Sequence, residues 1–72
     1  MLSENKRQVH PVVQQLRKTR IALGMSLEEL GERSGYSGCH IWSMEHGKIN
    51  AKIAMVSDIA ETLGMKIALV PK

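Results

Sequence analysis

Four glycines divide this chain into short segments, most of which carry apolar residues at the three- and four-residue spacing of an α-helix. Glycine commonly follows the last helical residue, because it adopts a left-handed backbone conformation without steric cost. The pattern therefore predicts a mainly α-helical protein with four helices. The expected helices span residues 11–23, 27–34, 38–46 and 51–63, and they end at Gly24, Gly35, Gly47 and Gly64.

The expected helix starts carry residues that suit a first turn. Pro11 has no N–H group to leave unpaired at the first helical position. Ser26 and Glu29 have the S-x-x-E spacing of a capping box, in which the serine oxygen accepts a backbone N–H bond. Ser37 and Asn50 precede the two later helices, and we expect both to act as N-caps.

Two short segments flank the helical domain, which we place at residues 10–64. Residues 1–9 are polar without an apolar period, which predicts a flexible arm. Residues 65–72 form a tail rich in strand formers, which predicts a short β-strand. Because the chain offers no second strand, we expect pairing with another copy across a two-fold dimer. The alternative is a tail packed irregularly on the last helix. The expected dimer residues are Met65, Ile67 and Leu69.

Composition limits the possible stabilising devices and activities. The 72 residues include one cysteine, so no disulfide forms within the chain, and no Cys/His cluster has zinc-finger spacing. The three histidines suggest no catalytic or metal site, so we expect neither enzymatic activity nor a cofactor. The unpaired cysteine, the short apolar runs and the polar N-terminus predict a cytoplasmic protein.

Positive charge is concentrated near the N-terminus. The chain has a net charge of +3 and a pI of about 9.4. Residues 1–20 alone carry five basic side chains and one acidic side chain, a net +4. This distribution favours an anionic partner.

Residues 27–46 have the pattern of two helices that meet at a sharp corner. Gly31 leaves room where the helices cross, and Gly35 permits a positive φ in the turn. Ile41 anchors the second helix on the core. Together these residues predict a helix-turn-helix, with Leu30, Tyr36 and Met44 filling the other core-facing positions.

Two stretches resemble a known family. RIALGMSLEEL at residues 20–30 and MEHGK at residues 44–48 look like the motifs of the lambda-repressor-like, Cro-type (XRE) helix-turn-helix family, and the likeness extends over residues 12–64. LGMKIALVP at residues 63–71 is similar to the strand-ended antitoxins of the HipB kind. The family resemblance implies a buried ion pair between Arg20 and Glu45, whose geometry would fix how the helices cross.

The resemblance also implies which residues face DNA. It places Gly38, Cys39 and Ser43 at the base edges, with His40 and Trp42 beside them. Gly38 permits close approach, the Cys39 thiol suits a thymine methyl, and the Ser43 hydroxyl discriminates weakly. Two interpretations of Trp42 stay open. It either packs against the sugar-phosphate wall or thymine methyls, or covers the loop after the third helix.

Phosphate contacts are expected from three places. The start of the second helix offers free N–H groups, the loop after the third helix carries polar side chains, and the arm is basic. These contacts give salt-dependent affinity without sequence information. The expected residues are Leu27, Glu28, His46, Lys48, Asn50, Lys6 and Arg7.

The sequence thus favours a sequence-specific regulator of transcription, most simply a repressor, that binds a palindromic site in double-stranded DNA as a homodimer. The alternative is an antitoxin or anti-regulator whose main role is to bind a partner protein.

Overall fold

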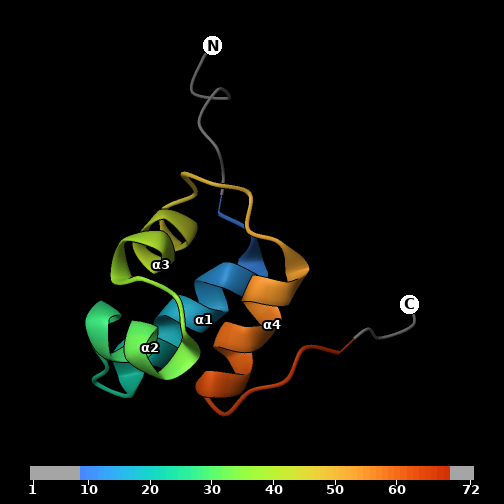
Figure 1. Cartoon of the computed structure of the whole chain (residues 1–72). Helices are drawn as coiled ribbons and strands as arrows, with labels where there is room; N and C mark the ends of the chain where they lie inside the picture. Colours follow the sequence, from blue (N-terminus) through green and yellow to red (C-terminus); the bar gives the residue numbers. More distant parts are fainter. Residues whose placement is uncertain (1–8, 69–72) are drawn as a thin grey trace.

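The computed structural model describes residues 9–68. These residues form four helices that pack around one apolar core (Figure 1). The mainly helical architecture is confirmed, and the first three helices lie within one residue of the expected limits. No helix within these residues is both long and apolar enough to cross a membrane. Residues 1–8 of the expected arm, Lys6 and Arg7 among them, lie outside the described part, as does Leu69. The helices are α1 Pro11–Ala22, α2 Leu27–Ser34, α3 Gly38–Glu45 and α4 Ile53–Thr62.

Side-chain caps fix the starts of the first three helices. The Ser26 hydroxyl accepts a bond of 2.9 Å from the Glu29 N–H, and the Ser37 hydroxyl accepts one of 3.0 Å from the His40 N–H. The start of α1 has a cap that the sequence analysis missed, since the His10 ring accepts a bond of 3.1 Å from the Val12 N–H. Histidine is not among the usual capping residues, so composition gives little indication of this role.

The expected cap of α4 is wrong. The helix begins at Ile53, later than expected, with Lys52 at the N-cap position and no side-chain cap bond. Ile49 and Ala51 pack against the core from the preceding loop, which keeps the backbone extended through Lys52. Asn50 is exposed and lies before this extended stretch, too far from the helix start to cap it.

The core is aliphatic and rich in methionine. Leu30 of α2, Ile41 of α3 and Ile59 of α4 are its largest fully buried side chains. They join α2 to the helices on either side, and α1 contacts both α3 and α4. The remaining buried apolar residues are Val13, Leu16, Met44, Met55, Val56, Ala60 and Leu63.

The tail is irregular where it is described. Residues 65–68 form no strand, so the expected β-strand is wrong for this part of the tail. The Met65 N–H donates a bond of 2.8 Å to the Ala60 carbonyl at the end of α4. Met65 and Ile67 pack against their own core, which matches the irregular alternative. These two side chains gain burial without a second strand, because the core of their own chain offers an apolar surface.

Candidate nucleic-acid interface

Glycine chemistry sets the corner between α2 and α3. A Cβ atom on Gly31 would lie 2.5 Å from the Tyr36 carbonyl oxygen, so only glycine allows the turn to pass this close to α2. Gly35 ends α2 with a φ of 90°, a left-handed conformation that glycine accepts readily. The corner therefore forms as the sequence pattern indicates.

The corner leaves one face of α3 open to solvent. Ile41 and Met44 bury the inner face, and α3 packs on α1 and α2 at the edge of the molecule (Figure 1). Helical spacing turns the side chains between these two anchors away from the core. The exposed residues of α3 are Cys39, His40 and Trp42, and Ser43 is half-buried among them.

Gly38, the first residue of α3, packs against α2. It is half-buried against the start of α2, and a Cβ atom there would stand 3.6 Å from the Leu27 carbonyl group. Its place is thus in the contact between α2 and α3. Four of the five expected base-facing residues remain grouped on the outer part of α3.

Trp42 is held on the surface by a neighbour one turn away. Its ring is stacked on His46 with centroids 4.1 Å apart and planes inclined by 18°. The side chain is 42% exposed. Nδ1 of His46 lies 2.9 Å from the Trp42 carbonyl oxygen, which can only accept, so Nδ1 is the donor. Trp42 and His46 have i, i+4 spacing along the chain, but their stacking was not foreseen.

A bidentate ion pair ties α1 to the end of α3. Nε and Nη2 of Arg20 donate to the two carboxylate oxygens of Glu45 at 2.7 and 3.0 Å. Nη1 of Arg20 donates to the Met25 carbonyl at 2.8 Å. The Glu45 side chain is only 2% exposed. The pair joins the residues that the family resemblance matched, and it fixes α3 relative to α1.

A second arginine approaches the same carboxylate. Nε of Arg17 lies 3.6 Å from Glu45, and the Arg17 side chain is 48% exposed. This approach of Arg17 to Glu45 was not predicted from the sequence. Its place one turn before Arg20 on α1 brings it to the same side of the helix.

A polar contact connects the corner to α4. The Tyr36 hydroxyl donates a bond of 2.8 Å to the Asp58 carboxylate. This hydrogen bond raises the pKa of Tyr36 above its ordinary value of 10.0, since the neutral phenol is the form that donates. Tyr36 also meets the His40 ring edge-on at 5.8 Å. Tyr36 is thus a half-buried residue that makes a polar contact with α4, rather than a purely apolar core residue.

The expected phosphate-binding groups within the described residues come from the start of α2 and from the end of α3 and the loop after it. The backbone N–H groups at the start of α2 have no partner within the helix, although the Glu28 and Glu29 side chains place negative charge there. Glu29 is paired with Arg33 at 3.0 Å, which offsets one of these charges. Lys48 and Asn50 are exposed in the loop between α3 and α4.

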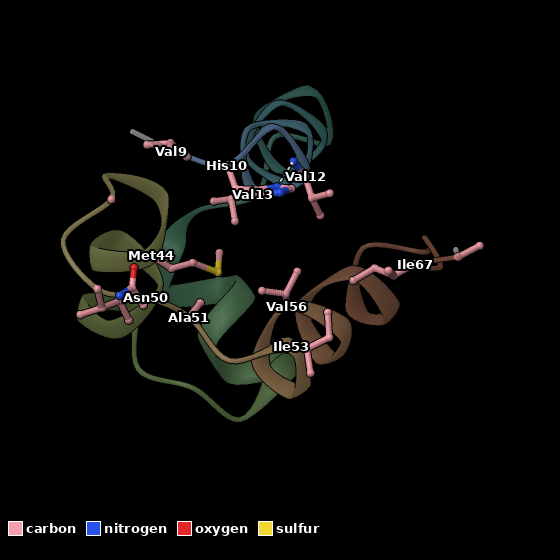
Figure 2. Close-up of a pocket in the computed structure, with 13 residues that line it drawn as sticks. Val9, His10, Val12, Val13, Met44, Asn50, Ala51, Ile53, Val56 and Ile67 are labelled. Carbon is pink, nitrogen blue, oxygen red and sulfur yellow. Dashed lines mark hydrogen bonds between the residues drawn. The ribbon is translucent and has the colours of Figure 1, made fainter. Parts of the chain in front are cut away.

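A groove of about 480 Å³ lies between α1, the loop from α3 to α4, α4 and the tail (Figure 2). Val12 and Val13 of α1 face Ile53 and Val56 of α4 across it. Ile67 of the tail lines one end. The groove is mainly apolar and carries no cluster of ionisable groups.

Within residues 9–68 no group of three His, Cys, Asp or Glu side chains is arranged to hold a metal ion. Cys39 is free and exposed.

Three features described above are typical of DNA-binding helix-turn-helix domains: the sharp corner between α2 and α3, the open face of α3, and the Arg20–Glu45 ion pair that orients α3. Comparison with known proteins agrees: residues 12–72 match the model of a family described as helix-turn-helix domain, and the chain belongs to that family. It is 39% identical over 61 residues to the uncharacterized HTH-type transcriptional regulator y4dL of Sinorhizobium fredii. That alignment covers 85% of this chain and 31% of the relative, so the chain spans about a third of that protein. No solved structure gives a significant match.

Proposed function

We propose that this protein is a sequence-specific regulator of transcription that binds double-stranded DNA by placing α3 in the major groove. The observation that carries the proposal is the open face of α3 on a corner whose geometry is fixed. Gly31 sets the close approach of the turn, and the Arg20–Glu45 pair sets the angle of α3 against α1. A rigid helix presented in this way is the reading element of such domains.

Within the helix-turn-helix domains, the lambda-repressor-like type fits best. The Arg20–Glu45 pair occurs between the motifs that resemble this type, and its buried bidentate geometry supports the likeness. The similarity to a protein named as a transcriptional regulator favours a role in gene control. Repression by occupying a promoter is the simplest mechanism, because it requires only that α3 and the flanking phosphate contacts bind the site.

Phosphate contacts would position α3 on the duplex. We assign them to the backbone N–H groups of Leu27 and Glu28 and to the exposed side chains of Lys48 and Asn50. His46 fits less well, because its Nδ1 already donates to the Trp42 carbonyl and a neutral ring has no second N–H to offer. The expected contacts from Lys6 and Arg7 stay a prediction.

A homodimer on a palindromic site completes the proposal. Ile53 is 72% exposed at the rim of the apolar groove, and Val12 beside it is 38% exposed. Ile67, one of the tail residues assigned to the dimer, lines the same groove. A second copy seated here would bury these side chains. It would place the two α3 helices in major grooves about 34 Å apart.

The antitoxin alternative has less support. It draws on the strand-ended tail, of which residues 65–68 form no strand, and on the weak set of base-reading side chains on α3. A role confined to binding a partner protein would also leave the open face of α3 without a purpose.

Selection of bound duplexes from a random DNA pool, followed by salt titration of the affinity, tests the proposal. We expect saturable binding to a palindromic site, with an affinity that falls as salt rises. Lys48→Ala should weaken binding to all duplexes and lower the salt slope by about one, whereas Ser43→Ala should change sequence preference. Lys18→Ala, an exposed substitution on α1, is the charge-matched control. Absence of saturable, salt-sensitive binding to every duplex would refute the proposal.

A further inference from the structure

The open face of α3 has an unusual chemical character for a helix that reads base pairs. The most discriminating contacts to guanine and adenine come from bidentate Arg, Lys, Asn or Gln side chains. The segment GCHIWSME contains none of these residue types. Its one ionised side chain, Glu45, is buried in the pair with Arg20. Readout through hydrogen bonds must therefore be weak on this face.

The polar groups that remain on α3 are partly committed elsewhere. His40 packs edge-on against Tyr36, and the hydroxyl of Ser43 belongs to a half-buried residue. A single hydroxyl both donates and accepts, so it separates the four base pairs poorly. These groups add little to the specificity that the rest of the face must supply.

The apolar part of the face is well presented. Cys39 and Trp42 are both exposed and lie three residues apart on α3, a spacing that makes them neighbours on one surface. The stack on His46 holds the indole ring in place, so little conformational entropy is lost when the ring makes a contact. Within the major groove, the apolar feature of a base pair is the C5-methyl group of thymine.

We propose that Cys39 and Trp42 recognise thymine C5-methyl groups, so that α3 reads its site through methyl contacts more than through hydrogen bonds. The inference rests on the proposed function, because it requires α3 to enter the major groove. It extends that function by naming the chemical feature that is read and the two side chains that read it. The expected site therefore has thymine at the positions opposite these residues.

The test uses the full chain and the site obtained by selection. Each thymine is replaced singly by deoxyuridine, which removes the C5-methyl group and leaves every hydrogen-bonding group unchanged. Burial of one methyl group corresponds to roughly a fourfold change in affinity. We expect losses of about this size at one or two thymines in each half-site, and none at the other thymines.

A second arm restores the methyl group on another base. At a sensitive position the T·A pair is changed to C·G, and the cytosine is then methylated at C5. The methylated duplex should bind more tightly than the unmethylated one by about the factor that separates thymine from deoxyuridine. Equal affinity of the two cytosine duplexes would contradict the inference.

Protein variants assign the contacts. Trp42→Ala and Cys39→Ser should each abolish the preference for thymine over deoxyuridine at one position. Lys18→Ala, an exposed substitution on α1 outside the proposed interface, should retain the preference at both positions. All three residues are exposed, so a thermal unfolding curve close to that of the parent protein is expected for each variant.

The outcomes separate the two proposals. If binding is saturable and every deoxyuridine duplex binds as tightly as its parent, the methyl inference is overturned and DNA binding stands. If Trp42→Ala weakens thymine and deoxyuridine duplexes equally, Trp42 contacts the sugar-phosphate wall and its assigned role is wrong. If no duplex binds saturably, the proposed function fails and the inference fails with it.

Discussion

The ion pair between Arg20 and Glu45 allows a quantitative prediction about stability. Substitution of Glu45 by alanine leaves the Arg20 guanidinium without its carboxylate, although this side chain is only 12% exposed. Loss of one partner from a buried pair costs about 3–5 kcal/mol, because the other charge stays buried and uncompensated. A chain of 72 residues is expected to have a free energy of unfolding of roughly 4–11 kcal/mol. Glu45→Ala should therefore remove a large part of the stability.

Thermal and urea unfolding followed by circular dichroism measure the effect. In a domain of this size each kcal/mol lowers Tm by roughly 4–8 °C, so Glu45→Ala should lower Tm by about 12 °C or more. Arg17→Ala is the matched control, because Arg17 approaches the same carboxylate at 3.6 Å but is 48% exposed. Solvent screening should limit its cost to about 1 kcal/mol or less.

A double substitution distinguishes the free-energy cost of an unpaired buried charge from the loss of the ion-pair attraction itself. Replacement of both Arg20 and Glu45 by methionine removes both charges and retains much of the volume. Such a variant should be more stable than Glu45→Ala, since no buried charge is left without a partner. The reasoning is refuted if Glu45→Ala unfolds with a free energy within about 1 kcal/mol of the parent protein.

Three further predictions follow from the structure. Gly31→Ala should destabilise the protein by about 1–3 kcal/mol in urea unfolding, because the new Cβ atom meets the Tyr36 carbonyl oxygen. Gly38→Ala should cost much less, because a Cβ atom there has 3.6 Å of space, and equal costs would contradict the close approach at Gly31. Because the pKa of Tyr36 is raised in the folded state, its stabilising hydrogen bond to Asp58 is fully present below pH 10.0 and is lost as pH rises through the folded-state pKa. Tyr36→Phe should therefore reduce the loss of Tm at alkaline pH, and an unchanged alkaline profile would exclude this role. If the proposed homodimer forms through the groove, Ile53→Lys should shift it to monomer in analytical ultracentrifugation with little change in monomer folding, because Ile53 is 72% exposed. A variant that dimerises as strongly as the parent protein would exclude the groove as the dimer contact.

Local sequence patterns predicted much of the fold. The limits of the first three helices were foreseen because caps, apolar spacing and terminal glycines act within one or two turns of chain. The corner at Gly31 and Gly35 was foreseen for the same reason, and the family motifs matched Arg20 with Glu45 across 25 positions.

The start of α4 and the shape of the tail were predicted wrongly. Asn50 has good capping chemistry, but Ile49 and Ala51 bury their side chains in the core and keep the chain extended to Lys52. Met65 and Ile67 belong to a strand-like sequence, but both pack on their own core without a strand partner. Burial against distant residues outweighed local preference at both places.

The sequence by itself determined where the helices lie and which glycines the corner requires, because these properties depend on neighbours along the chain. The tertiary structure decided which side chains of α3 stay open to solvent, how Trp42 rests on His46, and where α1, α4 and the tail leave an apolar groove. These features depend on how the surfaces of separate elements meet in space. Periodicity along a single helix does not specify that arrangement.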